Sequence, residues 1–228
     1  MNPTILRPAD FAAEAARFIL GHARDAIAAR GLFRLALSGG NTPRAVHAEL
    51  VRLGADVAWN RVQITFGDER CVPPDHADSN YRMARETLLE AVAIPTGNVF
   101  RIRGEIAPAV AAQEYEDKLA AVSARYGEPR YVHDLVLLGL GEDGHTASLF
   151  PGSPALDETV RNVIPATGPK PPPQRITMTF PLLNAARHVC FLVTGVGKHA
   201  LVEEIAAGGS TYPAGRVRAA AVTWIVGT

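Results

Sequence analysis

The chain has 228 residues, of which 47% are hydrophobic and 20% charged, a composition typical of a globular protein with a sizeable core. Basic and acidic residues are equal in number, at 23 each, so the overall charge does not indicate binding to nucleic acid or to an anionic membrane. Residues 1–10 lack the basic and apolar regions of a signal peptide, and no apolar run reaches the roughly 20 residues that span a bilayer. The two cysteines, Cys71 and Cys190, form no CxxC pair, which favours reduced thiols in a cytoplasmic protein.

The apolar pattern predicts strands that alternate with helices along most of the chain. In chain order we expect a helix over 11–30, a strand over 33–37, a helix over 43–53, a strand over 62–66, helices over 80–92 and 107–126, strands over 135–140, 176–180 and 189–194, a helix over 198–207 and a strand over 221–226. Thr42 is the expected N-cap of the second helix and Pro43 its first residue. This order predicts a doubly wound α/β fold, with a mainly parallel sheet flanked by helices, in a single domain over residues 1–228.

The first strand-to-helix turn is rich in glycine and polar residues: Ser38-Gly39-Gly40-Asn41-Thr42. Glycines let backbone N–H groups approach an anion closely, and the N-terminus of the next helix carries partial positive charge. The turn is therefore a candidate phosphate cradle, although a tight turn without a ligand fits these residues equally well. A loosened nucleophile elbow, with Ser38 as an exposed nucleophile, is a weaker interpretation because the helix is expected to begin several residues after the serine.

A second glycine-rich turn, over 139–146, follows the most apolar strand of the chain and contains Asp143 and His145. Imidazole titrates near neutral pH, so His145 is the candidate general base, and Asp143 could fix its tautomer or raise its basicity. The other histidines are expected to have structural roles or to lie on the surface: His22, His47, His76, His133, His188 and His199. Because no HExxH or similar ligand spacing occurs, we expect no metal site.

Charged residues stand at three further strand boundaries. Asp68 and Arg70 follow the second expected strand, where they could orient a polyol and supply a guanidinium. Arg175 and Lys198 lie at the boundaries of later strands and suit the phosphate end of a ligand. Since ligands of open parallel sheets bind at the carboxyl ends of the strands, these side chains are candidates for one site. A solvated loop or ordinary surface charge is the alternative for each of them.

Five blocks of this sequence are similar to the 6-phosphogluconolactonase family, which forms a larger group with the glucosamine-6-phosphate deaminases. The blocks are 37–43 (LSGGNTP), 67–70 (GDER) followed by 78–81 (DSNY), 139–150 (GLGEDGHTASLF), 175–177 (RIT) and 194–198 (TGVGK). They occur in the family's order and extend from about residue 33 to 200, which is most of the chain. Each block alone is modest evidence of kinship, whereas the five in order are highly specific.

The resemblance implies a cytoplasmic enzyme that opens 6-phospho-D-glucono-1,5-lactone in the pentose phosphate pathway, on a Rossmann-like fold of the sugar-phosphate isomerase type. The roles it implies are catalytic base for His145, phosphate binding for the Ser38 to Thr42 turn, Arg175 and Lys198, and sugar contact for Asp68 and Arg70. It implies no cofactor and no nucleic-acid or membrane partner. The sequence does not determine the oligomeric state, and a monomer is the working expectation.

Two kinds of protein that resemble the same fold give the competing interpretations. The deaminases carry a glutamate shortly after their Asp-Gly-His, and that glutamate supports the histidine in ring-opening acid chemistry. Here Phe150 stands in the glutamate's place and cannot transfer a proton. Sugar-phosphate-sensing domains of transcription regulators bind similar ligands without turnover, but they need a DNA-binding module, and no basic helix-turn-helix segment fits this chain. The lactonase is therefore the favoured interpretation.

Overall fold

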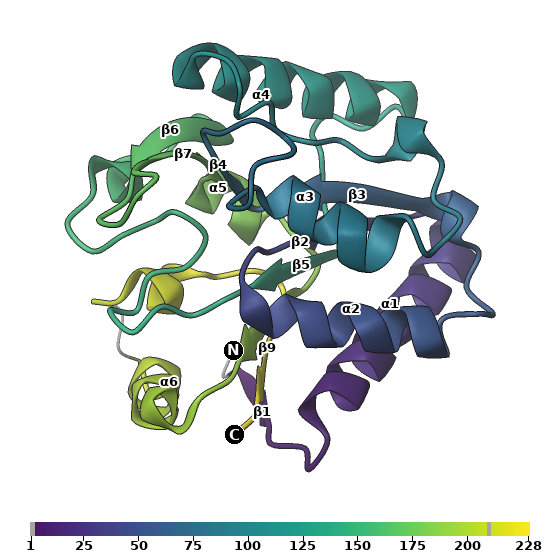
Figure 1. Ribbon diagram of the computed structural model, residues 1–228, viewed down its shortest axis with the longest axis horizontal. Coiled ribbons are helices and arrows are strands. Elements are labelled where there is room, and N and C mark those ends of the chain that lie inside the picture. Colours follow the sequence, from purple (N-terminus) through teal and green to yellow (C-terminus); the bar gives the residue numbers. More distant parts are fainter. Residues whose placement is uncertain (1–2, 209–210) are drawn as a thin grey trace.

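A computed structural model of the chain describes residues 3–208 and 211–228 (Figure 1). The strands are β1 (Thr4–Leu6), β2 (Phe33–Leu37), β3 (Val62–Phe66), β4 (Asp68–Arg70), β5 (Leu135–Leu138), β6 (Val163–Thr167), β7 (Gln174–Met178), β8 (Val189–Val193) and β9 (Val222–Val226). The α-helices are α1 (Phe11–Arg30), α2 (Asn41–Leu53), α3 (Asn80–Ala84), α4 (Pro108–Arg125), α5 (Phe180–Asn184) and α6 (His199–Ala206).

Six of the strands form a parallel sheet in the order β1-β9-β8-β5-β2-β3. Every residue of β2, β3, β5 and β8 is buried, as expected for parallel strands that are covered on both faces. Figure 1 shows α4 over one face of this sheet and α1 with α2 over the other. The arrangement is the doubly wound, mainly parallel α/β fold that the sequence predicted.

Local interactions fix both ends of helix α1. The Asp10 side chain accepts a hydrogen bond from the backbone N–H of Ala13 at 3.1 Å and so caps α1. Gly31, with φ of 76°, ends that helix in the left-handed conformation that glycine tolerates. Most predicted boundaries agree with the structure within two residues.

The winding direction of the sheet reverses between β2 and β5. The chain runs from β2 to β3 on one side and later returns to β5, β8 and β9 on the other. Ligands of α/β sheets bind in the crevice at the carboxyl ends of strands where the order reverses. The glycine-rich turns over 38–42 and 139–146 follow β2 and β5, so the topology brings both to this crevice.

A second, antiparallel sheet of β4, β7 and β6 was not predicted. The strand expected over 176–180 lies at Gln174–Met178 and pairs with β4 and β6, so its assignment to the main sheet was wrong. Pairing between segments this far apart in the chain leaves no local periodicity, which is why the sequence did not reveal it. The register places Arg70 opposite Arg175 and Asp68 opposite Thr177.

Two predicted helices also need correction, one at its start and one in its interior. Helix α2 begins at Asn41 with Gly40 as its N-cap, because the φ of 102° at Gly40 turns the chain early. Thr42 is therefore not the cap, and its hydroxyl instead lies 2.7 Å from the Thr194 hydroxyl oxygen. The helix expected over 80–92 is α-helical only in α3 and continues as a π-helical turn over Arg85–Leu89. The short elements β1, β6 and α5 were not predicted because too few residues carry their pattern.

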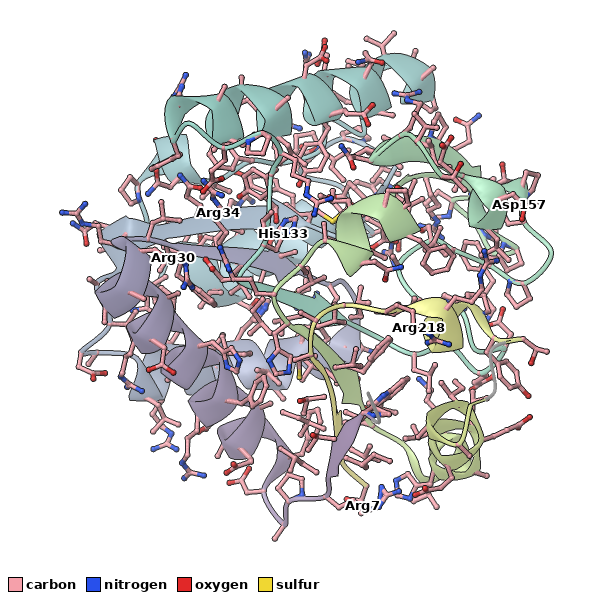
Figure 2. All side chains as sticks on the ribbon, turned by 180° about the vertical axis from the view of Figure 1, so that it is seen from behind. Arg7, Arg30, Arg34, His133, Asp157 and Arg218 are labelled. Carbon is pink, nitrogen blue, oxygen red and sulfur yellow. The ribbon has the colours of Figure 1, made fainter. Side chains whose placement is uncertain are left out.

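A buried polar cluster lies at the amino ends of β2, β3 and β5, and we call it the amino-end cluster: Arg34, Gln63, Tyr131, His133 and Asp134. These side chains are between 0% and 6% exposed. The Asp134 carboxylate accepts hydrogen bonds from the Arg30 guanidinium at 2.7 Å and from the backbone N–H of Arg34 at 2.8 Å. Figure 2 shows Arg30, Arg34 and His133 together on one side of the molecule.

None of the helices within residues 3–208 and 211–228 combines the length and apolar character of a membrane-spanning segment.

Candidate active site

Two adjoining pockets open at the carboxyl ends of the strands. The histidine pocket, of about 500 Å³, is lined by residues that include Asp143, His145, Ser148, Phe150, Lys170 and Arg175. The turn pocket, of about 380 Å³, is lined by the 38–43 segment and Lys198, among others. Asp68, Arg70 and His145 line both pockets. The structure thus brings every site residue predicted from the sequence to the wall of one or both pockets.

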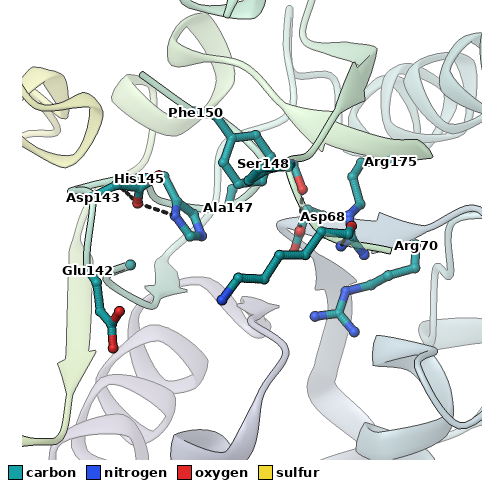
Figure 3. Close-up of a pocket in the computed structure, with 12 residues that line it drawn as sticks. Asp68, Arg70, Glu142, Asp143, His145, Ala147, Ser148, Phe150 and Arg175 are labelled. Carbon is teal, nitrogen blue, oxygen red and sulfur yellow. Dashed lines mark hydrogen bonds and ion pairs between the residues drawn. The ribbon is translucent and has the colours of Figure 1, made fainter. Parts of the chain in front are cut away.

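His145 and Asp143 form a hydrogen-bonded pair at the edge of the histidine pocket (Figure 3). The imidazole Nδ1 lies 2.6 Å from the Asp143 Oδ1, and the backbone N–H of His145 donates to the same oxygen at 3.1 Å. Burial acts to raise the pKa of Asp143, but the hydrogen bonds from His145 outweigh it and lower that pKa below its usual value. An ionised Asp143 accepts a hydrogen bond from the Nδ1–H group, which leaves the free lone pair of the neutral imidazole on Nε2.

Local backbone geometry holds the imidazole in place. A Cβ atom on Gly141 would lie 2.0 Å from the His145 Nδ1, so only glycine leaves room for the ring. Ala147, two residues after His145, has a φ of 47°, in a region that side chains other than glycine rarely adopt. The Phe150 ring packs against the imidazole with centroids 4.6 Å apart. These constraints hold the His145 imidazole, with 32% of its side chain accessible, against an apolar ring.

The turn pocket combines a helix N-terminus with an ammonium group. Gly40, the N-cap of α2, supplies no side chain to the N–H groups of the first turn, and these groups can therefore bind an anion. The Lys198 ammonium donates a hydrogen bond to the backbone carbonyl of Leu140 at 2.6 Å, which ties it to the second glycine-rich turn. A helix N-terminus and an ammonium group at one pocket both favour an anionic ligand.

Ser38 lies in the wall of the turn pocket but is only 9% exposed. Its hydroxyl has no hydrogen-bond partner among the residues that the structure describes, so no base is placed to activate it. Helix α2 begins three positions later, at Asn41. The geometry does not favour Ser38 as a nucleophile.

Two guanidinium groups face each other at the other side of the histidine pocket. Figure 3 shows Arg70 and Arg175 across from His145, with Asp68 and Ser148 between them. Arg70 donates to the backbone carbonyl of Asp78 at 2.6 Å, whereas the Nε and Nη1 of Arg175 find no partner in the described part of the chain. Burial lowers the pKa of Arg175, and the positive charge of Arg70 lowers it further. The positive charges of Arg70 and Arg175 at the pocket wall suit an anionic or strongly polar ligand.

Arg175 and Lys198 do not line the same pocket. Arg175 lines the histidine pocket together with Lys170, whose backbone carbonyl accepts a hydrogen bond from the Arg175 Nη2 at 3.4 Å. Lys198 lines the turn pocket. The sequence reasoning grouped the two cations and missed Lys170, because a lysine within a proline-rich loop carries no signal of its own.

Sequence reasoning also missed the residues that hold Asp68. The Ser148 hydroxyl donates to the Asp68 Oδ2 at 2.6 Å, and the Asn80 side-chain amide donates to the Asp68 Oδ1 at 3.1 Å. Both residues stand inside blocks that resemble the lactonase family, and that was the available signal. Among the described residues, no group of three or more His, Cys, Asp or Glu side chains could hold a metal ion.

Comparison with known proteins places this geometry in a family. The sequence model described as "Glucosamine-6-phosphate isomerases/6-phosphogluconolactonase" matches residues 7–225. A 6-phosphogluconolactonase of Synechocystis is 46% identical over 193 residues, which cover 83% of this chain and 79% of the relative. A rice protein named "Probable 6-phosphogluconolactonase 3, chloroplastic" is 44% identical over 191 residues, or 79% of this chain. The matched part spans only 58% of the length of that rice relative.

The solved structures give the same result for the fold. The crystal structure of a 6-phosphogluconolactonase from Thermotoga maritima superposes with a TM-score of 0.87 at 29% identity. The match covers 99% of this chain and all of that chain.

Proposed function

Because the chain belongs to the glucosamine-6-phosphate isomerase/6-phosphogluconolactonase family, we propose that it hydrolyses 6-phospho-D-glucono-1,5-lactone to 6-phospho-D-gluconate. The observation that carries the proposal is the His145–Asp143 pair, which presents a basic nitrogen beside two pockets that suit a phosphorylated polyol. A δ-lactone is an activated ester, so water can open it without a covalent enzyme intermediate.

In this mechanism His145 acts first as a general base. Its Nε2 removes a proton from a water molecule, which attacks the lactone carbonyl carbon. Asp143 keeps the proton on Nδ1 and stabilises the imidazolium that forms. The imidazolium then donates its proton to the departing ring oxygen, which restores the neutral histidine and completes the hydrolysis.

The remaining groups position the substrate and stabilise charge. The N–H groups at the start of α2 and the Lys198 ammonium would hold the phosphate, and this remote anchor would align the carbonyl with His145. Asp68 would accept hydrogen bonds from sugar hydroxyls. The oxyanion would be stabilised by backbone N–H groups of a glycine-rich turn or by Arg70.

The deaminase reaction needs a second proton-transferring side chain next to the histidine. The residue that packs on the imidazole here is Phe150, at 4.6 Å between ring centroids, and it has no proton to give. This contact supports hydrolysis over deamination. A cytoplasmic location stays a prediction from the sequence, since the rice relative is named as chloroplastic.

The direct test measures two reactions on the purified protein. We expect hydrolysis of 6-phosphogluconolactone without release of ammonia from glucosamine 6-phosphate, and the same rate with and without a chelator. Deamination without lactone hydrolysis would contradict the proposal, and loss of the rate in chelator would contradict the metal-free mechanism.

A further inference from the structure

The carboxylate of Asp68, which lines both pockets, is held by two neutral donors from different parts of the chain. Ser148 donates to its Oδ2 at 2.6 Å and Asn80 to its Oδ1 at 3.1 Å. Both donors are buried, at 1% and 3% exposed. Each carboxylate oxygen keeps a further lone pair, so the fixed group can still accept hydroxyl groups of a polyol.

Asn80 also packs against the glycine-rich turn over 38–42. Its side-chain Nδ2 donates a second hydrogen bond, at 2.9 Å, to the backbone carbonyl of Asp68. On the other side of the amide, a Cβ atom on Gly39 would lie only 1.9 Å from the Asn80 Oδ1. The missing side chain of Gly39 therefore makes room for the amide, which lies between the glycine-rich turn and the Asp68 carboxylate.

A buried carboxylate fixes the backbone of Asn80. Glu69, which is 2% exposed, accepts hydrogen bonds from the backbone N–H of Asn80 at 2.7 Å and of Tyr81 at 2.8 Å. These are the first N–H groups of α3, and a negative charge at a helix N-terminus is favourable. The Ser79 hydroxyl donates to the same carboxylate at 3.1 Å. Asn80 is thus anchored by its backbone and acts on Asp68 by its side chain.

We propose that Asn80 is a positioning residue for the hydrolysis, an inference that rests on the proposed function. Its amide sets the orientation of the Asp68 carboxylate and the distance between that carboxylate and the glycine-rich turn. A polyol whose phosphate is anchored in the turn then presents its hydroxyls to Asp68 and its carbonyl to His145. Ser148, three residues after His145, holds the same carboxylate from the catalytic side.

The first test compares Asn80→Ala with Ser79→Ala. A hydrogen bond to a charged group contributes roughly 10- to 100-fold, so Asn80→Ala should lower kcat/KM for 6-phosphogluconolactone by about that factor. Ser79 is equally buried, at 2% exposed, and caps α3 through its bond from the Arg82 N–H at 3.1 Å, but it has no hydrogen bond to Asp68. Ser79→Ala should lower the melting temperature and reduce kcat/KM much less than Asn80→Ala, because the Glu69 carboxylate keeps its bonds from the backbone N–H groups of Asn80 and Tyr81.

The second test uses Asn80→Asp, which keeps the shape of the side chain and replaces the donor with an oxygen. Two carboxylates at hydrogen-bond distance cannot both ionise readily, so the pair binds a proton as the pH falls and the donor is restored. The ratio of kcat/KM between the variant and the wild type should therefore rise towards acid pH. A folding defect alone would not give this pH dependence.

The other charged groups near Asp68 are the same in both proteins, so the ratio isolates the effect of the substitution. Glu69 and Arg70 lie on the same strand and Arg175 on the neighbouring strand β7. The others line the pockets that Asp68 lines: Glu142, Asp143, His145, Lys170 and Lys198.

Two outcomes would overturn the inference: an Asn80→Ala enzyme as active as Ser79→Ala, or a pH-independent ratio for Asn80→Asp. Either would make Asn80 a structural residue only. A wild type that does not hydrolyse the lactone contradicts the proposed function instead. In that case, calorimetric binding of 6-phosphogluconate tests the role of Asn80. If Asn80 positions Asp68, Asn80→Ala should bind 6-phosphogluconate more weakly than Ser79→Ala does.

Discussion

Strand β5 has a histidine near each end, and the two environments are opposite. His133, before the strand, is 0% exposed, and its Nε2 lies 2.9 Å from the Thr65 hydroxyl oxygen. Burial, with a smaller effect of the Arg34 charge, lowers the pKa of His133 to about 3. His145, after the strand, is 32% exposed and has a carboxylate partner at 2.6 Å. His133 thus has a neutral partner inside the core, whereas His145 has a carboxylate partner at the wall of a pocket.

The same contrast holds for the surrounding charges. In the amino-end cluster, Asp134 accepts hydrogen bonds from two separate arginine residues, and Arg34 packs against the Tyr131 ring at 4.8 Å. At the pockets, Arg70, Arg175 and Lys198 line the cavity walls. Charges paired within the protein contribute to stability, whereas cations at a pocket wall can bind an anionic ligand. Substitutions at the two ends should therefore change different quantities.

The largest expected effect is on catalysis at the pocket end. His145→Ala should lower kcat by roughly 100- to 10,000-fold, the range that a general base contributes, because the imidazole is the proton acceptor of the proposed mechanism. The melting temperature and the calorimetric affinity for 6-phosphogluconate should hardly change. A variant that keeps more than half of the wild-type kcat would remove His145 from the mechanism.

The next effect is on stability at the amino end. Asp134→Ala removes the partner of Arg30 and of the Arg34 backbone N–H, together with an ion pair to Arg187 at 3.3 Å. Breaking a buried pair costs roughly 3–5 kcal/mol, and the partial exposure of both arginine side chains favours the lower end of that range. Unfolding in denaturant should show the loss, while kcat of the folded enzyme stays the same.

The control for this variant is Asp56→Ala. Asp56 accepts two hydrogen bonds from Arg24 on the surface, and its loss should change stability little, since exposed ion pairs contribute little. Equal losses of stability for Asp134→Ala and Asp56→Ala would show that burial does not determine what these aspartates contribute to stability.

These outcomes bear on what the sequence could predict. The turns that follow β2 and β5 were predictable because glycine, a polar residue and an apolar strand stand next to each other in the chain. The pairing of Arg70 with Arg175 was not, because an antiparallel ladder joins residues without any local signal. The roles of Asn80 and Ser148 depend on where Asp68 lies in space, and only the tertiary structure shows that.

The dependence of stability on pH should also differ between the two ends. The folded protein holds His133 neutral, whereas the unfolded chain binds its proton near the ordinary pKa of about 6.5. The unfolded state therefore gains protons first, and stability should fall by about 1.4 kcal/mol per pH unit for this group as the pH drops from 6.5 towards 3. His47, whose pKa burial lowers to about 4, adds to the loss between pH 6.5 and 4.

Denaturant unfolding between pH 6.5 and 5 measures this slope. A His133→Gln variant should have a shallower slope than the wild type, and His145→Ala should serve as its control outside the core. An unchanged slope in His133→Gln would mean that the buried imidazole does not control acid stability.

The smallest expected effect distinguishes the two cations at the pocket end. The family resemblance assigns both Lys198 and Arg175 to the phosphate, yet they line different pockets. A charge-assisted hydrogen bond contributes at least about 1.5 kcal/mol, or roughly tenfold in affinity. If both side chains hold the phosphate, Lys198→Ala and Arg175→Ala should each lower kcat/KM for 6-phosphogluconolactone about tenfold and leave the slow hydrolysis of plain gluconolactone unchanged.

Comparing the phosphorylated lactone with plain gluconolactone tests each cation separately. Lys198 lies with the uncapped N-terminus of α2, so a loss confined to the phosphorylated lactone would place the phosphate in the turn pocket. Arg175 shares its pocket with the His145–Asp143 pair. An equal loss on both lactones for Arg175→Ala would mean that its guanidinium acts on the reacting carbonyl or the sugar. Lys198 would then be the one of the two cations that recognises the phosphate.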